Sequence, residues 1–146
     1  MKFYLLHPVA VHFPIALLTL GFAAEGVNHL SKNECIRSWV SQAALWMLWL
    51  GTLAAWAAVG LGLLAEETVP HVPAAWEVLE EHEELAFWSA GLFTALSLCR
   101  FFLKDLWETR RWIFLAVWAV LLGLLFTAAK HGGDLVYEFG VGVARS

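Results

Sequence analysis

Long runs of apolar residues, separated by short polar segments, dominate this chain. Four of the runs are close to the roughly 20 residues that a helix needs to cross a hydrocarbon core of ~30 Å. None of them alternates apolar and polar positions as the strands of a membrane barrel do, and a span must satisfy its own backbone hydrogen bonds. The pattern predicts an all-α protein, a four-helix transmembrane bundle in a single membrane domain, 1–146. The predicted spans cover about residues 8–30, 39–64, 85–103 and 112–131.

Proline and glycine refine these boundaries. Pro14 lies inside the first run, where it removes a backbone hydrogen bond and predicts a kink. Pro73 is typical of a helix start, so we expect an external helical extension of the third span from about residue 74. A glycine pair at 132–133 predicts the end of the fourth helix, which leaves residues 132–146 as a tail that packs over the external face.

Charged residues are few and unequally divided. They make up 15% of the chain, against about a quarter in a soluble domain. The two short loops that follow the first and third spans share one side and hold six of the nine basic residues. The positive-inside rule therefore predicts that these loops are cytoplasmic and that both termini are external. The acidic residues gather on the external side, which argues against nucleic acid as a partner.

Histidines concentrate on the external side in this topology. Histidine in or near a span is costly and tends to be functional, and neutral imidazole is a common ligand for haem iron, copper and zinc. A single histidine at a helix end is more often an interfacial residue bonded to water or lipid headgroups, but the convergence of five weighs against that interpretation for the group. The five are His7, His12, His71, His82 and His131, whereas His29 is cytoplasmic.

His12 and His82 are the first candidates for a ligand pair. His7 and His12 are five residues apart, about 140° around a helix, so both face one metal only if the proline kink distorts the turn. His12 is deeper by about 7.5 Å, which makes it the better candidate, with His7 and His131 as second ligands. His71 lies in a loop bounded by prolines and is the weakest member of the group.

A b-type haem is the cofactor that this arrangement favours. Two histidines from two helices of a membrane bundle, with large aromatic residues nearby, are typical of such a site. A compact metal site would need three or four ligands, often with a carboxylate or thiolate, and both cysteines fall on the other side. Four tryptophans lie deep in the spans, where either helix packing or a flat ligand explains them. They are Trp46, Trp49, Trp56 and Trp118.

Glu25 is an ionisable residue within the first span. His29 follows it four residues later, so the two side chains can meet on one helix face. Two interpretations stay open: a proton path from the cytoplasm, or an interfacial pair near the headgroups, which is the more ordinary arrangement.

Both ends of the chain resemble a known family. The strings HPVAVHFPIALL at 7–18 and GGDLVYEFGVGV at 132–143 are similar to the opening and closing signatures of small bacterial four-helix membrane proteins, catalogued as domain of unknown function twenty-two thirty-one. A histidine that opens the third span, here His82, also fits, and the first signature includes His7 and His12 as a unit. The resemblance covers essentially the whole chain. It implies a multi-pass protein of the bacterial inner (plasma) membrane and an association with Rieske-type and cytochrome proteins; with the charge bias of the loops, it places the histidine cluster on the periplasmic side.

Three functional hypotheses follow. The first is a haem-b-binding electron-transfer protein that links membrane quinol to an external redox partner, with the acidic face docking a basic protein such as a cytochrome c. The second is a non-catalytic accessory subunit that packs against other membrane subunits. The third is a copper- or zinc-binding membrane protein.

Overall fold

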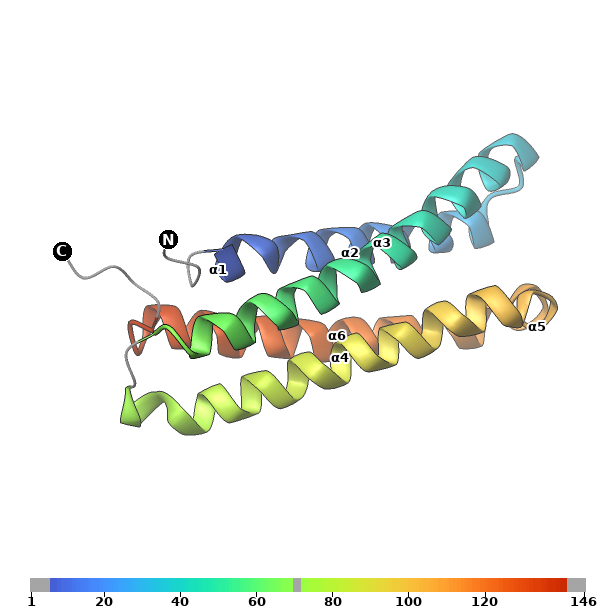
Figure 1. Cartoon of the computed structure of the whole chain (residues 1–146). Helices are drawn as coiled ribbons and strands as arrows, with labels where there is room; N and C mark the ends of the chain where they lie inside the picture. Colours follow the sequence, from blue (N-terminus) through green and yellow to red (C-terminus); the bar gives the residue numbers. More distant parts are fainter. Residues whose placement is uncertain (1–5, 70–71, 142–146) are drawn as a thin grey trace.

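The computed structural model describes residues 6–69 and 72–141. Helices and short turns make up these two stretches, and no strand occurs in them. The helices are α1 (Leu6–Ala10), α2 (His12–Leu30), α3 (Glu34–Glu66), the 3₁₀ helix η2 (Pro73–Ala75), α4 (Trp76–Phe102), α5 (Lys104–Thr109) and α6 (Arg111–Tyr137), as labelled in Figure 1.

Four helical segments of the described chain are long and apolar enough to cross a membrane, which confirms the predicted fold class. Each of them contains one predicted span to within a residue. The side of the membrane on which the termini lie stays a prediction. The four segments are Leu6–Leu30, Glu34–Glu66, Pro73–Phe102 and Arg111–Tyr137.

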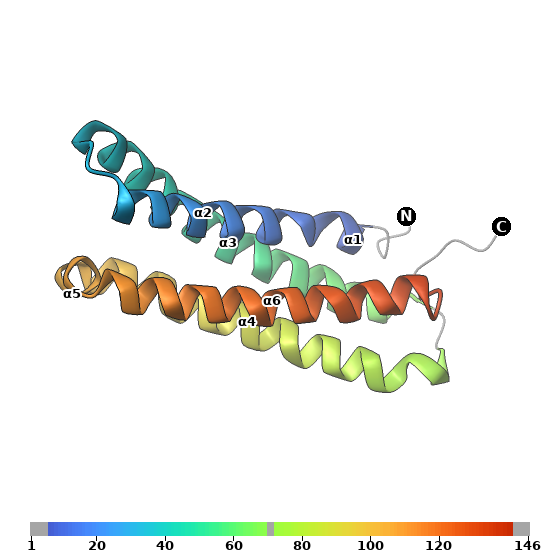
Figure 2. The same ribbon diagram turned by 180° about the vertical axis from the view of Figure 1, so that it is seen from behind.

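Two helical hairpins build the bundle. The first consists of α1, α2 and α3, and the second of α4, α5 and α6; they pack face to face (Figures 1 and 2). Because α2 and α4 each contact both α3 and α6, α2 faces α4 diagonally across the bundle axis. We call the end where α1 begins and α6 ends the histidine end, and the end that carries α5 the loop end.

The inward face of α2 repeats every three or four residues. Its buried positions are spaced as in helices that pack along their length. The same face of the first span continues toward the histidine end, where it includes His7. These buried residues are Pro14, Leu18, Gly21, Glu25 and Asn28.

The first span is interrupted near its start. α1 ends at Ala10 and α2 begins at His12, with Val11 between them. This break falls beside Pro14, which cannot donate the backbone hydrogen bond that would continue the helix. The break lies in the segment for which the sequence predicts a kink.

The predicted end of the fourth helix at the paired glycines is wrong, because α6 continues to Tyr137. Gly132 serves close packing instead, since a Cβ atom there would lie 2.9 Å from Cε1 of His82. The glycine with a left-handed backbone is Gly140, with φ of 64°, a conformation that favours glycine.

Glycine also lets α2 and α3 approach one another closely. A Cβ atom on Gly51 would lie 2.7 Å from Cγ of Leu18. Small residues at such contacts are how helices associate in lipid, where tight packing drives association.

Gly51→Ala is expected to lower the free energy of unfolding by about 1–3 kcal/mol, because it overpacks this contact. Gly60→Ala on the same helix is the matched control, since a Cβ atom there meets nothing within 4 Å. The control should be neutral or stabilising by up to about 1 kcal/mol, the helix-propensity difference between the two residues. Thermal unfolding in detergent measures both, and equal effects of the two changes would contradict the packing role of Gly51.

Candidate functional site

The structure brings His7 and His82 together at the histidine end. Their ring centroids are 6.1 Å apart and the ring planes make an angle of 85°. His7 comes from the short helix that leads into α2 and His82 from α4, so the two half-buried side chains meet from diagonal helices across the bundle axis.

Both imidazoles are held by backbone carbonyl groups. Nδ1 of His7 lies 2.9 Å from the oxygen of Ala58, and Nδ1 of His82 lies 2.8 Å from the oxygen of Ala128. A carbonyl oxygen only accepts, so each Nδ1 carries the proton and donates it. In a neutral imidazole the lone pair then stands on Nε2. Histidines that ligate metals are usually oriented in this way by their second nitrogen.

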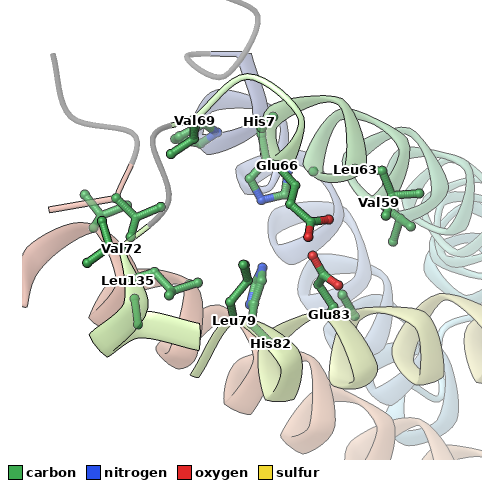
Figure 3. A pocket seen from close by; sticks show the side chains of 18 of the residues that line it. His7, Val59, Leu63, Glu66, Val69, Val72, Leu79, His82, Glu83 and Leu135 are labelled. Carbon is green, nitrogen blue, oxygen red and sulfur yellow. The ribbon is translucent and has the colours of Figure 1, made fainter. Parts of the chain in front are cut away.

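An apolar pocket of about 140 Å³ adjoins the histidine pair. Figure 3 shows the carboxyl groups of Glu66 and Glu83, from α3 and α4, pointing toward one another beside the histidines. The volume of the pocket is close to the roughly 150 Å³ of an engineered cavity that binds benzene. The aliphatic part of the lining includes Val69, Val72, Leu79 and Leu135.

His12 lies away from this pair. Its side chain is exposed, it is not among the residues that line the pocket, and its Nδ1 lies 2.7 Å from the oxygen of Pro8 in the preceding turn. The pairing of His12 with His82 stays a prediction. The exposed residues Ala16, Leu20, Ala23 and Val27 follow His12 along the same outward stripe of α2.

His131 is close to the site but is bonded elsewhere. Its Nε2 lies 3.1 Å from a carboxyl oxygen of Glu81, and its Nδ1 lies 2.9 Å from the oxygen of Thr127. His71 is outside the described residues. In the part of the chain that the structure covers, no group of three or more His, Cys, Asp or Glu side chains is placed to hold a metal ion.

The seven-residue spacing of the first span indicates that His7 lies on its inward face. His7, Pro14, Gly21 and Asn28 follow one another at intervals of seven residues. The last three are buried, and positions seven apart lie on nearly the same helix face. Depth in the membrane favours His12 over His7, whereas the seven-residue register separates the inward from the outward side chain.

Glu25 forms a second buried polar site at the loop end. It is 3% exposed, and its carboxyl group accepts hydrogen bonds from Nε1 of Trp107 at 2.9 Å and from Nδ2 of Asn28 at 3.4 Å. The ring of His29 instead packs against Trp112, with centroids 4.0 Å apart. Glu25 therefore bonds to the loop helix α5 rather than to the histidine four residues later.

The fold and the site define a four-helix membrane protein with two facing histidines between its hairpins. The chain belongs to the family described as Predicted membrane protein (DUF2231), whose profile matches residues 5–145. This confirms the resemblance found in the two end motifs. Comparison with curated proteins and with solved structures gives no significant match.

Proposed function

We propose that this protein binds a b-type haem between His7 and His82 and transfers electrons at the membrane. The main support for this proposal is the separation of the two imidazole rings. Metal–imidazole bonds are about 2.0–2.1 Å long, so two imidazoles on opposite sides of one metal ion have ring centres roughly 6 Å apart. The 6.1 Å between the centroids of His7 and His82 fits that arrangement.

The number of ligands also favours haem. A six-coordinate haem iron would take two ligands from the protein, because the macrocycle supplies the other four, whereas a structural zinc site takes four protein ligands. The described residues offer two imidazoles with their Nδ1 atoms already bonded to carbonyl oxygens. This matches what haem requires.

The size of the pocket sets a condition on this proposal. A volume of about 140 Å³ suits a ligand the size of benzene, so a macrocycle enters only if the hairpins part at the histidine end, and the two imidazoles must return to about their present spacing to bind one iron. The hydrogen bond of 2.9 Å between Trp56 and Thr94 is one of those that join the hairpins. Thr94 lies 12 residues after His82, about 18 Å along the helix.

Other bonds between the hairpins lie still nearer the loop end. The hydroxyl groups of Thr52 and Ser97 are 3.0 Å apart, and Trp107 donates to Glu25. Separation at the histidine end would break the hydrogen bond between the carboxyl groups of Glu66 and Glu83 and would leave these bonds intact.

A bound haem would supply one-electron chemistry, and the chain would contribute axial ligation, burial and orientation. In this proposal the histidine end faces outward from the bacterial inner membrane, where it exchanges electrons with membrane quinol and an external partner. Exposed carboxylates near this end support the docking of a basic protein such as a cytochrome c. They are Glu67, Glu77, Glu80, Glu81 and Glu84.

The small volume favours a second candidate, a single copper or zinc ion. A single ion bound by both imidazoles is much smaller than a macrocycle, and imidazole suits both metals.

An optical spectrum and an elemental analysis of the same purified sample separate these candidates. We expect iron at about one atom per chain together with a Soret band, either as purified or after addition of haem. Copper or zinc without a Soret band would instead favour the second candidate. A sample that contains none of these metals and gives no Soret band after haem addition would contradict both.

A further inference from the structure

We propose that each hairpin carries a complete half-site, in which a glycine positions the histidine so that its Nε2 faces the ligand. The positioning residues are Gly62 in the first hairpin and Gly132 in the second. The identity of the ligand rests on the proposed function, whereas the orientation of the histidines does not.

The first half-site lies wholly within the first hairpin. His7 on α1 donates from Nδ1 to the carbonyl oxygen of Ala58 on α3. Gly62 follows Ala58 by four residues, so it lies on the same face of α3, one turn further on. A Cβ atom on Gly62 would lie 3.1 Å from Cε1 and 3.2 Å from Nδ1 of His7. The imidazole therefore occupies the space that a side chain at this position would take.

The second hairpin repeats this arrangement. His82 on α4 donates from Nδ1 to the carbonyl oxygen of Ala128 on α6. Gly132 again follows the accepting residue by four positions, and a Cβ atom on it would lie 2.9 Å from Cε1 of His82 and 3.4 Å from Nδ1. Two separate parts of the chain thus use the same three components: a histidine, a helix carbonyl and a glycine one turn later.

The glycines are needed for the hydrogen bonds. In each case the nearest atom is Cε1 of the imidazole that reaches the carbonyl, at 3.1 Å for His7 and 2.9 Å for His82, which is closer than carbon atoms normally approach. A methyl group would push the ring away from the helix and lengthen the bond that places the proton on Nδ1. Without that bond, Nε2 is no longer fixed as the nitrogen with the lone pair.

The carbonyl group and the glycine that position each histidine belong to the same hairpin as that histidine. Separation of the hairpins would therefore leave His7 bonded to Ala58 and His82 bonded to Ala128. The two Nε2 atoms keep their orientation while a flat ligand enters between them. This property suits a cofactor that is larger than the closed pocket.

The first test uses ligand-free protein labelled with ¹⁵N in its histidines. We expect NMR spectra in micelles to identify His7 and His82 as the tautomer protonated at Nδ1, with assignments from His7→Gln and His82→Gln. Protonation at Nε2 in the unaltered protein would overturn the inference, whether or not haem binds.

The second test compares glycine variants with neighbours on the same helices. Gly62→Ala and Gly132→Ala should each lose the Nδ1-protonated signal of the adjacent histidine and weaken haem binding by about 10–100-fold, as changes around metal ligands do. Gly60→Ala and Gly133→Ala are the controls, because a Cβ atom at either position meets nothing within 4 Å. Unchanged tautomers in the first two variants would overturn the inference. The predicted tautomers in a protein that takes up no haem would support the half-sites and contradict the proposed function.

Discussion

His82→Ala is expected to abolish the low-spin haem spectrum and to weaken haem binding by more than about 100-fold, and His7→Ala should do the same. Each change would remove one of the two proposed haem ligands, whereas changes around a ligand already cost about 10–100-fold. Both rings meet across the bundle axis with centroids 6.1 Å apart, so the loss of either leaves a single imidazole. Haem titration followed by a reduced-minus-oxidised difference spectrum measures the effect.

His12→Ala is the matched control for this experiment. His12 belongs to the same end motif as His7, but it is exposed and bonds to the preceding turn. We expect its replacement to leave the spectrum and the affinity unchanged. If His12→Ala loses the haem while His7→Ala keeps it, the pairing of His12 with His82 that the sequence predicts is the right one.

Trp107→Ala is expected to lower the free energy of unfolding by about 3–5 kcal/mol, the usual cost of truncating a buried tryptophan. Trp107 is 1% exposed and stacks on Phe114 with ring centroids 4.4 Å apart. Its Nε1 donates to Glu25, and a buried acceptor that loses its partner costs about a further 1–3 kcal/mol. Thermal or denaturant unfolding in detergent is the measurement.

Two further variants separate the contribution of packing from that of the hydrogen bond in the stability lost by Trp107→Ala. Trp107→Phe keeps most of the ring but removes the donor, so its cost should be close to that of the hydrogen bond alone. Trp39→Ala truncates a tryptophan that is 72% exposed and should change the stability little. Equal losses from Trp39→Ala and Trp107→Ala would refute the contribution of the buried Trp107 side chain to packing at the loop end.

The spans could be predicted because the length and apolar character of each run decide the outcome without reference to the rest of the chain. The choice between His7 and His12 needs one more step, because depth along a helix and direction around it are independent. Depth favoured His12, whereas the seven-residue register places His7 with the buried Pro14 and Gly21. Register was the better guide to which side chain faces the bundle axis.

Other features depend on contacts between residues that are distant in sequence. A glycine such as Gly132 can end a helix or admit a neighbouring side chain, and only the position of His82 decides between them. The partner of Glu25 outside its own helix is Trp107, 82 residues away on the loop helix α5. The spacing between Glu25 and His29 therefore gave no indication of the bond that forms.

The electron paramagnetic resonance spectrum of the oxidised, haem-loaded protein tests the proposal that His7 and His82 together hold one haem. We expect a low-spin signal from iron with two imidazole ligands, at about one haem per chain, which is lost when either His7 or His82 is replaced by alanine. A high-spin signal from the unaltered protein, or a two-imidazole signal that survives both replacements, would contradict it.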